Sequence, residues 1–446
     1  MPLLDTDQAL TRNSYYAATA PQAVAFPPLV GEARCDVAVV GGGLAGLSAA
    51  LDLRARGFEV VLLEAREIGF GASGRNGGQA IHGLACDQDT IEQQLGLDEA
   101  RHVWAMSIEA LDLLRARIAE HGIACDWQDG YLGVATTPRK AAELHAQAER
   151  LESVYGYPMQ RIAAADIGRW IASPRYHGGV HDPRSGHLHP LKYTRGLATA
   201  AARAGVRLHE GTQATALVPG ERPVLRTTSA QGTGTLHARQ VLLAGNVYLH
   251  GVAPPLAPAL APRVMPVGTY IACTEGLPRA TADALIPDRS AVCDTNFVLD
   301  YFRTTVDDRM LYGGRVSYST VTPARLAESL RARMVHTFPQ LAGAKVEFAW
   351  GGFVDISMNR APDFGRLPAA TPGGPANVYY LQGFSGHGLA LTGLAGRLVA
   401  EAMGGDSTRF DVFARLKHRP FPGGALLRTP ALVLGMAWYR LRDMLG

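Results

Sequence analysis

Three glycines near the start of the chain have the spacing of a dinucleotide-binding turn. Gly41, Gly43 and Gly46 form a GxGxxG pattern, and an acidic residue, Glu64, follows the next apolar run. In this motif the first glycine makes a tight turn, the second lets a pyrophosphate approach the backbone, and the third lets helix and strand pack closely. Glu64 would accept hydrogen bonds from ribose hydroxyls and would repel the extra phosphate of NADP. The pattern therefore predicts a cofactor that contains ADP, without separating NAD from FAD.

Two further glycine-rich segments have the composition of cofactor loops. Residues 69–79 read GFGASGRNGGQ, in which Arg75 can pair with phosphate. Glycines this dense let the backbone come close to a polar ligand, although a mobile surface loop is the alternative. Residues 383–388 read GFSGHG between an apolar run and a helical pattern. The N-terminus of that helix could stabilise negative charge on a reduced flavin ring.

The elements around these motifs predict a parallel sheet. An apolar strand at 36–40, a helix from Leu44 that stops before Gly57, and a second strand at 59–63 form a βαβ unit. Further buried strands are expected at 206–210, 240–245 and 378–381, the last followed by a helix through Met403. Helices are expected at 91–121 and 138–153. Residues 263–316 alternate apolar and polar, which is typical of antiparallel strands with one exposed face.

We therefore predict an α/β protein with a Rossmann-like FAD-binding domain and an interleaved, antiparallel-sheet α+β substrate domain. The expected division has four parts. They are an N-terminal arm (1–34), an FAD-binding domain (35–90, 180–262 and 350–405), a substrate domain (91–179 and 263–349) and a C-terminal helical segment (406–446). Within the last part, Leu432 to Leu445 is expected to form a docking helix rather than a membrane anchor.

Composition narrows the function classes. The 446 residues are 47% hydrophobic and 19% charged with a net charge of +3, which argues against disorder and against nucleic-acid binding. The five cysteines are scattered without a CxxC pair, so neither a zinc site nor a disulfide framework is predicted. There is no signal-peptide pattern and no apolar run long enough to span a bilayer, and a cytoplasmic location is expected. Oligomeric state is not predicted.

The motifs VVGGGLAGLSAAL, LLEAREIGFGASGRNGGQ and LQGFSGHGLALTGLAGRLVAE resemble those of the FAD-dependent amine and amino-acid oxidases, such as D-amino-acid oxidase, glycine oxidase and sarcosine oxidase. NSYYA, SGHLHPLKY, LLAGNVYL, LDYFR, LYGG and FPGG extend the similarity to the subgroup that oxidises γ-glutamylputrescine. The resemblance covers about residues 14–446. It implies removal of a hydride equivalent from the carbon bearing a neutral amine, with aldehyde, ammonia and hydrogen peroxide as products in putrescine catabolism. The implied partners are a small amine and oxygen.

The cofactor residues expected from the motifs and the resemblance lie in four segments. They are Gly41, Gly43, Leu44, Ala45 and Gly46; Glu64, Ala65 and Arg66; Ala72, Ser73, Arg75, Asn76, Gly77, Gly78 and Gln79; and Ala244, Gly245, Asn246, Gly383, Gly386, His387 and Gly388.

The sequence departs from the sarcosine-oxidase pattern in three ways. Those relatives attach flavin to a cysteine in the C-terminal half, but no cysteine follows Cys293, so non-covalent FAD is expected. Leu389 and Ala390 stand where the relatives place a lysine for a substrate α-carboxylate, which favours an amine without that group. No lysine occurs between Lys192 and Lys345 to assist oxygen reduction.

Four residues are candidates for substrate binding. Arg303 could hold a distal carboxylate, or it could be an arginine exposed at alternate positions of a strand. Tyr301 could line the pocket and Trp350 could wall the flavin pocket, with core packing as the alternative for both. His82 could face the substrate, with a ring satisfied by backbone groups as the alternative. His387 is expected to support the flavin loop rather than to act as a base. His187 and His189 lack a nearby acidic or cysteine partner, so no metal site is predicted. No catalytic residue is assigned.

Three other functions stay open. They are an oxidase for another amine (a diamine, pipecolate or sarcosine), an FAD dehydrogenase that passes electrons to a quinone, and a binding protein that keeps FAD only as a structural element.

Overall fold

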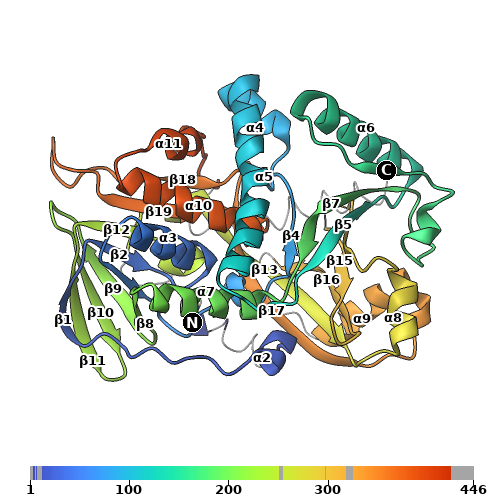
Figure 1. The fold of residues 1–446 in the computed structure, drawn as a ribbon, viewed down its shortest axis with the longest axis horizontal. Coiled ribbons are helices and arrows are strands. Elements are labelled where there is room, and N and C mark those ends of the chain that lie inside the picture. Colours follow the sequence, from blue (N-terminus) through green and yellow to red (C-terminus); the bar gives the residue numbers. More distant parts are fainter. Residues whose placement is uncertain are drawn as a thin grey trace.

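The computed structural model describes residues 4, 5, 7, 13–250, 255–296, 298–317 and 325–422, with the backbone alone for 315–317. These residues form two halves, with a long helix, α5, between them at the centre of the molecule (Figure 1). The helix predicted over Leu432 to Leu445 lies outside the described residues.

A six-stranded sheet forms the core of one half. Its order is β18-β19-β12-β2-β3-β8, with β18 antiparallel at the edge and the other strands parallel. The strands are β2 (Val37–Val40), β3 (Val60–Leu63), β8 (Arg207–His209), β12 (Gln240–Leu243), β18 (Asp363–Arg366) and β19 (Val378–Gln382). β2, β3 and β19 are buried along their whole length because other elements cover both faces of the sheet.

Helices cover one face of this sheet and a small sheet covers the other. Helices α3 (Leu44–Ala55), α7 (Pro190–Arg203) and α10 (Gly388–Met403) share a hydrophobic core with Val37, Val39 and Leu62. On the opposite face, Ala38, Val40 and Val61 pack with residues of a four-stranded sheet. That sheet has the order β1-β11-β10-β9, formed by β1 (Gly31–Arg34), β9 (Gln213–Val218), β10 (Val224–Ser229) and β11 (Gly232–His237).

A nine-stranded sheet forms the core of the other half (Figure 1). Its order is β17-β13-β16-β15-β14-β5-β7-β4, with β6 beside β7. The strands are β4 (Gln79–Ala80), β5 (Gln128–Val134), β6 (Gln160–Ile162), β7 (Gly179–His187), β13 (Val264–Thr274), β14 (Ala291–Asp294), β15 (Tyr301–Thr304), β16 (Met310–Ser317) and β17 (Val346–Ser357). The antiparallel pairing predicted within 263–316 is confirmed, since β13, β14, β15 and β16 pair antiparallel along that segment. The predicted exposed face is wrong, because none of the residues of β13, β14 and β15 is exposed on either face.

The predicted helix over 91–121 is two helices, and this is a correction. Gly96, at φ +84°, separates α4 (Gln88–Leu95) from α5 (Leu97–Glu120). The helix predicted at 138–153 is α6 (Pro138–Tyr155). The remaining helices are α2 (Tyr15–Thr19), α8 (Arg279–Leu285), α9 (Leu326–Thr337) and α11 (Thr408–Ala414).

The division into domains stays a proposal, and the sheets place several segments differently from the expected boundaries. β7 and β17 belong to the nine-stranded sheet, although 180–187 and 350–357 were assigned to the FAD-binding domain. Helix α5 packs on α10 in the core of the six-stranded sheet, although 91–179 was assigned to the substrate domain. The end of the expected arm, 31–34, is strand β1. The pairing of strands decides which sheet each segment belongs to, and sequence composition does not reveal that pairing.

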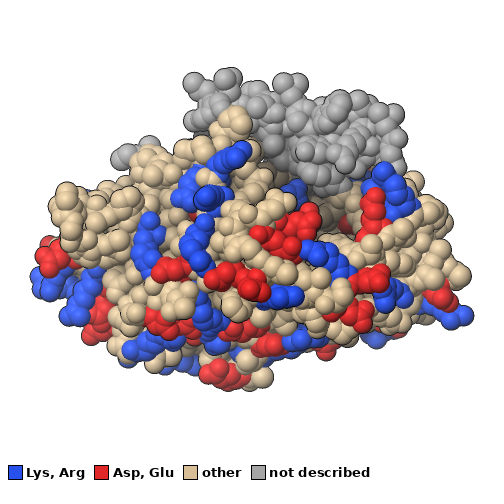
Figure 2. Space-filling model, turned by 90° about the horizontal axis from the view of Figure 1, so that it is seen from above, with Lys and Arg blue, Asp and Glu red and all other residues tan. Residues whose placement is uncertain are grey.

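None of the helices in the described part of the chain is long and apolar enough to cross a membrane. On the face drawn in Figure 2, basic and acidic side chains are interspersed rather than gathered by sign.

Gly396 sets the distance between α10 and α3. A Cβ at Gly396 would lie 2.5 Å from the backbone nitrogen of Ala49 and 2.6 Å from Ser48 Cβ. We expect Gly396→Ala to lower the free energy of unfolding by about 1–3 kcal/mol, because the helices must separate. That loss exceeds the gain of about 1 kcal/mol in helix propensity. Thermal unfolding measures it, with Gly168→Ala as control because no atom lies within 4 Å of its added Cβ. Equal melting temperatures for the two variants would contradict the expectation.

Candidate functional site

The first glycine motif forms a cradle without side chains at the carboxyl end of β2. A Cβ at Gly41 would lie 2.5 Å from the carbonyl oxygen of Ala244, and one at Gly43 would lie 2.7 Å from Ser73 Oγ. A Cβ at Gly46 would collide with the carbonyl oxygen of Gly41. The backbone is thus kept bare where α3 begins. A helix N-terminus of this kind can bind a phosphate, and its first amide, that of Leu44, donates to Ser73 Oγ at 2.9 Å.

Glu64 stands at the end of β3, beside this cradle. Its Oε2 accepts a hydrogen bond from the Gly42 amide at 2.7 Å and its Oε1 accepts one from the Arg66 amide at 2.9 Å. Burial raises the pKa of Glu64, and these two hydrogen bonds oppose the rise. The carboxylate is therefore placed where an ADP ribose would meet it.

A cavity opens at this edge of the six-stranded sheet. Nine residues predicted to bind the cofactor line it: Gly41, Gly43, Glu64, Ala65, Ala72, Ser73, Ala244, Gly245 and Asn246. Sequence reasoning missed Phe70, Thr212, Gln213, Tyr248 and Leu249, which also line it. Thr212 and Gln213 follow β8, whose carboxyl end reaches the same edge as those of β2 and β3, and that shared edge is the signal that could have found them. The bare backbone, the acidic residue and the position at the strand ends all fit a dinucleotide.

Arg75 lies away from the lining of this cavity. Its Nη1 pairs with Asp7 Oδ1 at 2.8 Å, and both side chains are buried. Its guanidinium also lies 4.8 Å from the centre of the Phe70 ring. In this arrangement a carboxylate of the N-terminal arm, rather than a phosphate, is the partner of Arg75, and Leu4 of the same arm lines the cavity.

Polar side chains fix the shape of the loop that ends at Gln79. Asn76 donates to the carbonyl oxygen of Ala72 at 2.9 Å and accepts from the Gly78 amide at 2.8 Å. Gln79 donates to the carbonyl oxygen of Val292 at 3.1 Å and accepts from the Cys293 thiol at 2.9 Å. These side chains bind the loop to itself and to β14.

Three of the four predicted substrate residues lie on strands of the nine-stranded sheet and contact this loop. Trp350 is fully buried and donates from Nε1 to the carbonyl oxygen of Arg75 at 2.9 Å. The Tyr301 ring lies against Gly77, where an added Cβ would be 2.8 Å from its Cε2. Arg303 donates to the carbonyl oxygens of Gly77 at 2.9 Å and Leu188 at 3.0 Å, and to the hydroxyl of Tyr16 at 3.1 Å.

Arg303 is buried and has no acidic partner among the described residues. Four contacts with protein oxygens occupy most of its donors, the fourth from Nη1 to the carbonyl oxygen of Thr304 at 3.5 Å. These contacts favour a role in joining the glycine loop to the arm over the predicted role of binding a carboxylate of the substrate, which stays a prediction.

A buried carboxyl group anchors the GFSGHG turn. The amide of Gly383, at φ +77°, donates to Asp355 Oδ2, and the Ser385 amide donates to the Asp355 carbonyl oxygen at 2.9 Å. Burial raises the pKa of Asp355 to about 7, against hydrogen bonds from the Gly383 and Phe384 amides. Sequence reasoning missed Asp355, because nothing near it in the chain marks it as a partner of this turn.

The histidines around the site have distinct partners. His387 Nε2 donates to the carbonyl oxygens of His82 and Ile81, at 3.0 and 3.2 Å, which agrees with the expected support of the loop. His187 Nε2 lies 2.9 Å from the carbonyl oxygen of Arg289, and His189 accepts from the Lys192 amide. Across the described residues, no three His, Cys, Asp or Glu side chains are grouped to hold a metal.

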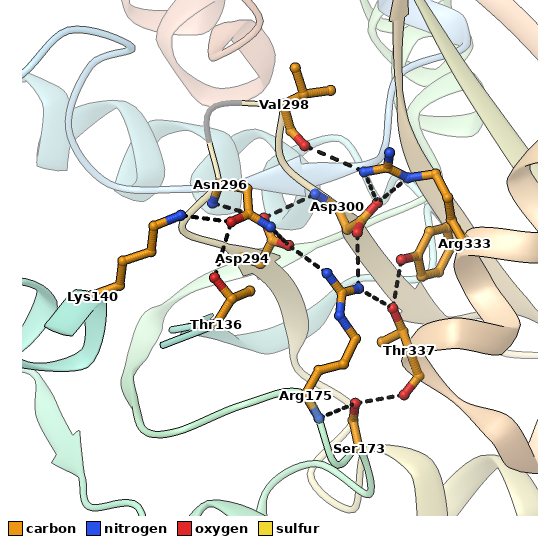
Figure 3. A network of polar contacts seen from close by, with 11 residues as sticks. Thr136, Lys140, Ser173, Arg175, Asp294, Asn296, Val298, Asp300, Arg333 and Thr337 are labelled. Atoms are coloured by element: carbon orange, nitrogen blue, oxygen red, sulfur yellow. Dashed lines mark hydrogen bonds and ion pairs between the residues drawn. The ribbon is translucent and has the colours of Figure 1, made fainter. Parts of the chain in front are cut away.

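A network of ion pairs holds the segment that leads into β15 (Figure 3). Asp300 lies between Arg175, at 3.1 Å from its Oδ2, and Arg333, at 2.7 Å from its Oδ1. Asp294 accepts from the amides of Asn296 and Asp300, both at 3.1 Å. Tyr301 directly follows Asp300, so the network fixes the strand that carries Tyr301 and Arg303.

Comparisons with known proteins identify relatives over almost the whole chain. A family model described as FAD dependent oxidoreductase (DAO) matches residues 36–402. The chain is 43% identical to gamma-glutamylputrescine oxidoreductase of Escherichia coli over 97% of its length and 99% of that protein. It is 37% identical to a probable oxidoreductase, OrdL, of Haemophilus influenzae over 97% of each chain.

Solved structures share the fold. Glycine oxidase from Geobacillus kaustophilus superposes with a TM-score of 0.68 at 22% identity, covering 83% of this chain and 94% of that one. L-amino acid deaminase from Proteus vulgaris gives a TM-score of 0.69 at 17% identity, covering 87% and 99%. The predicted fold class, an α/β protein with a Rossmann-like domain and an interleaved antiparallel sheet, is confirmed.

The charge of Asp294 generates a pH prediction for stability. Burial, followed by the neighbouring charge of Asp300, raises the pKa of Asp294 to about 6 from an ordinary 3.8. The folded protein therefore holds this proton more tightly than the unfolded chain. The stability so gained is complete at acid pH and is lost as the pH rises through 6.

We expect wild type to lose about 2 kcal/mol of stability relative to Asp294→Asn between about pH 4 and pH 8, because the amide does not ionise. Denaturant unfolding at both pH values measures the difference. Asp166→Asn, at a side chain that is 51% exposed, is the control and should show no such pH dependence. A constant difference between wild type and Asp294→Asn would refute the raised pKa.

Proposed function

The chain belongs to the family of FAD-dependent oxidoreductases, and on that premise we propose that it oxidises the primary amino group of γ-glutamylputrescine with oxygen as electron acceptor. FAD is its cofactor. The observation that carries the proposed substrate is the 43% identity to gamma-glutamylputrescine oxidoreductase over nearly the full length of both chains.

The glycine cradle and Glu64 would hold the ADP portion of FAD, and the GFSGHG turn with the loop ending at Gln79 would face the flavin. We propose that FAD is held without a covalent bond. Bound FAD would accept the hydride equivalent from the carbon that carries nitrogen. The resulting imine would hydrolyse to aldehyde and ammonia, and oxygen would take up two electrons and two protons to give hydrogen peroxide.

The first turn of α10 supports an amine that lacks an α-carboxylate. Leu389 and Ala390 are buried there, directly after the GFSGHG turn. An apolar pair offers no charge to a carboxylate next to the reacting carbon, and burying such a carboxylate unpaired would be costly. This favours a substrate whose charged groups lie at the far end of the chain.

The proposed function is tested with FAD-loaded protein and four amines: γ-glutamylputrescine, putrescine, sarcosine and pipecolate. We expect γ-glutamylputrescine to bleach the flavin under anaerobic conditions, and air to restore it with one peroxide per amine. If sarcosine or pipecolate bleaches the flavin in preference to γ-glutamylputrescine, the proposed substrate is wrong. Reduction without peroxide on aeration would show a dehydrogenase instead, and no bleaching by any amine would remove the amine-oxidising function.

Arg303→Leu distinguishes the two roles of Arg303. If it joins the loop to the arm, kcat/KM should fall by a similar factor for γ-glutamylputrescine and for putrescine, and FAD affinity should fall as well, because Gly77 and Leu188 lose their donor. A loss confined to γ-glutamylputrescine, with FAD affinity unchanged by flavin fluorescence, would instead place Arg303 on the substrate's carboxylate. Peroxide assays with both amines provide the comparison.

A further inference from the structure

His82 and a buried aspartate form a pair beside the cofactor loops. His82 follows β4, and its Nδ1 lies 2.7 Å from Oδ2 of Asp182 on β7. Its amide donates to Ser185 Oγ at 3.0 Å, which fixes the backbone as well as the ring. Because a carboxylate oxygen accepts at this distance, Nδ1 is the ring nitrogen that carries the proton when the ring is neutral.

Asp182 is built to stay charged although it is buried. The hydroxyl of Tyr157 donates to its Oδ2 at 2.9 Å and the Arg184 amide donates to its Oδ1 at 2.9 Å, while the Ser185 hydroxyl donates to Oδ2. Burial alone would raise the pKa of Asp182, but the hydrogen bonds from His82 and Ser185 outweigh it and hold the pKa below its usual value. The carboxylate is therefore a fixed negative charge behind the imidazole.

The other side of the His82 ring is open. Aromatic rings surround it, with ring centres at 5.2 Å for Tyr157, 5.8 Å for Trp104 and 6.1 Å for Tyr131. The side chain is nevertheless 14% exposed, and within the described residues Nε2 makes no hydrogen bond. Nε2 is thus an available acceptor in a setting where its ring can rotate little.

Both cofactor loops converge on this residue. β4, which continues the 69–79 loop, ends two positions before His82, and His387 of the GFSGHG turn donates to the His82 carbonyl oxygen. Burial, and then the charge of His82, lowers the pKa of His387 to about 4. His387 is therefore a neutral support, and His82 is the ring between the two loops whose Nε2 has no hydrogen-bond partner among the described residues. β4, β7 and α5 meet at this point near the middle of the molecule (Figure 1).

We propose that His82 binds the amino group of the substrate at Nε2 and takes its ammonium proton, and that Asp182 is the positioning residue that holds the ring for this step. The inference rests on the proposed amine oxidation. One N–H bond of the ammonium breaks and the Nε2–H bond forms, so the electron pair stays on the substrate nitrogen. Asp182 offsets the charge of the resulting imidazolium. The neutral amine left behind is the form that can release a hydride equivalent from its carbon.

Several charged and titratable groups face the pair from the surrounding elements, and they bear on any pH profile. They are Asp182 and Arg184 from β7, Tyr131 from β5, Tyr157 after α6, and His387 before α10. Burial raises the pKa of both tyrosines above their ordinary value and lowers that of His387, so these three groups stay uncharged near neutral pH, and Asp182 supplies a fixed negative charge next to His82.

The test compares two variants of the FAD-loaded enzyme with wild type. We expect His82→Gln to lower kcat/KM for γ-glutamylputrescine by about 100-fold, in the range of general acid–base catalysis. Asp182→Asn should lower it by about 10-fold and move the rising limb of the kcat profile to lower pH, because an amide no longer stabilises the imidazolium. Asp182→Glu, which restores the charge, should return the limb toward its wild-type position.

The matched control is Asp288→Asn, which removes the partner of His181 in a second His–Asp pair with a separation of 3.3 Å. It should leave the kcat profile unchanged. ¹⁵N spectra of the histidine rings give a readout independent of turnover. They should show His82 protonated at Nδ1 in wild type and a changed tautomer balance in Asp182→Asn, with His82→Gln identifying the signal.

The outcomes separate the two proposals. Suppose that wild type oxidises the amine, and that Asp182→Asn lowers kcat by the same factor at every pH without moving the rising limb. That result would overturn the role of Asp182. A His82→Gln enzyme with unchanged kcat/KM, or a His82 ring protonated at Nε2, would overturn the role of His82. If wild type oxidises none of the amines, the proposed function fails, whatever the tautomer of His82.

Discussion

The structure depends on how tightly the 69–79 loop is held between its two large sheets. The loop leaves β3 of the six-stranded sheet and enters β4 of the nine-stranded sheet, so it is the first covalent bridge between the halves. Its backbone has no regular ladder to satisfy its carbonyl groups, and buried donors do this instead: Trp350 at Arg75 and the Arg303 guanidinium at Gly77. A charged donor makes a stronger hydrogen bond to a carbonyl than a neutral one does. This is the physical reason for a buried arginine at a position where a hydrophobic residue would otherwise pack.

The same constraint explains which parts of the site could be predicted. Local sequence patterns mark the glycine motifs, Glu64 and the strands around them. A glycine-rich turn and the periodicity of a strand both depend on residues that are close together in the chain. Thr212 and Gln213 reach the cavity only through sheet order, and no local pattern marks them. The predicted roles of Arg75 and Arg303 assumed that a positive charge near a ligand faces it. In the structure Arg75 instead pairs with Asp7, and the guanidinium of Arg303 donates hydrogen bonds to carbonyl oxygens.

Buried carboxylates were the least predictable part of the site. Asp182, Asp294 and Asp355 are all buried, and each has hydrogen-bond partners: neighbours in the chain for Asp294, a distant turn for Asp355, and both kinds for Asp182. Their pKa values move in different directions, since burial raises those of Asp294 and Asp355 while His82 and its neighbours lower that of Asp182. In the sequence these three aspartates look like any others on strands or loops. Their chemistry arises from packing between elements, so only the three-dimensional arrangement distinguishes them.

The order of strands in the six-stranded sheet has a consequence for synthesis of the protein. β2 and β3 emerge from the ribosome early, but their parallel partner β12 begins at residue 240 and β19 at residue 378. β2 and β3 can pair with each other early, but the other edge of β2 lacks its partner β12 until more than half of the chain has been translated. Pairing over such separations is slow and leaves unpaired strand edges exposed. Nascent chains of this protein should accordingly expose an unpaired apolar edge of β2 until β12 has been made.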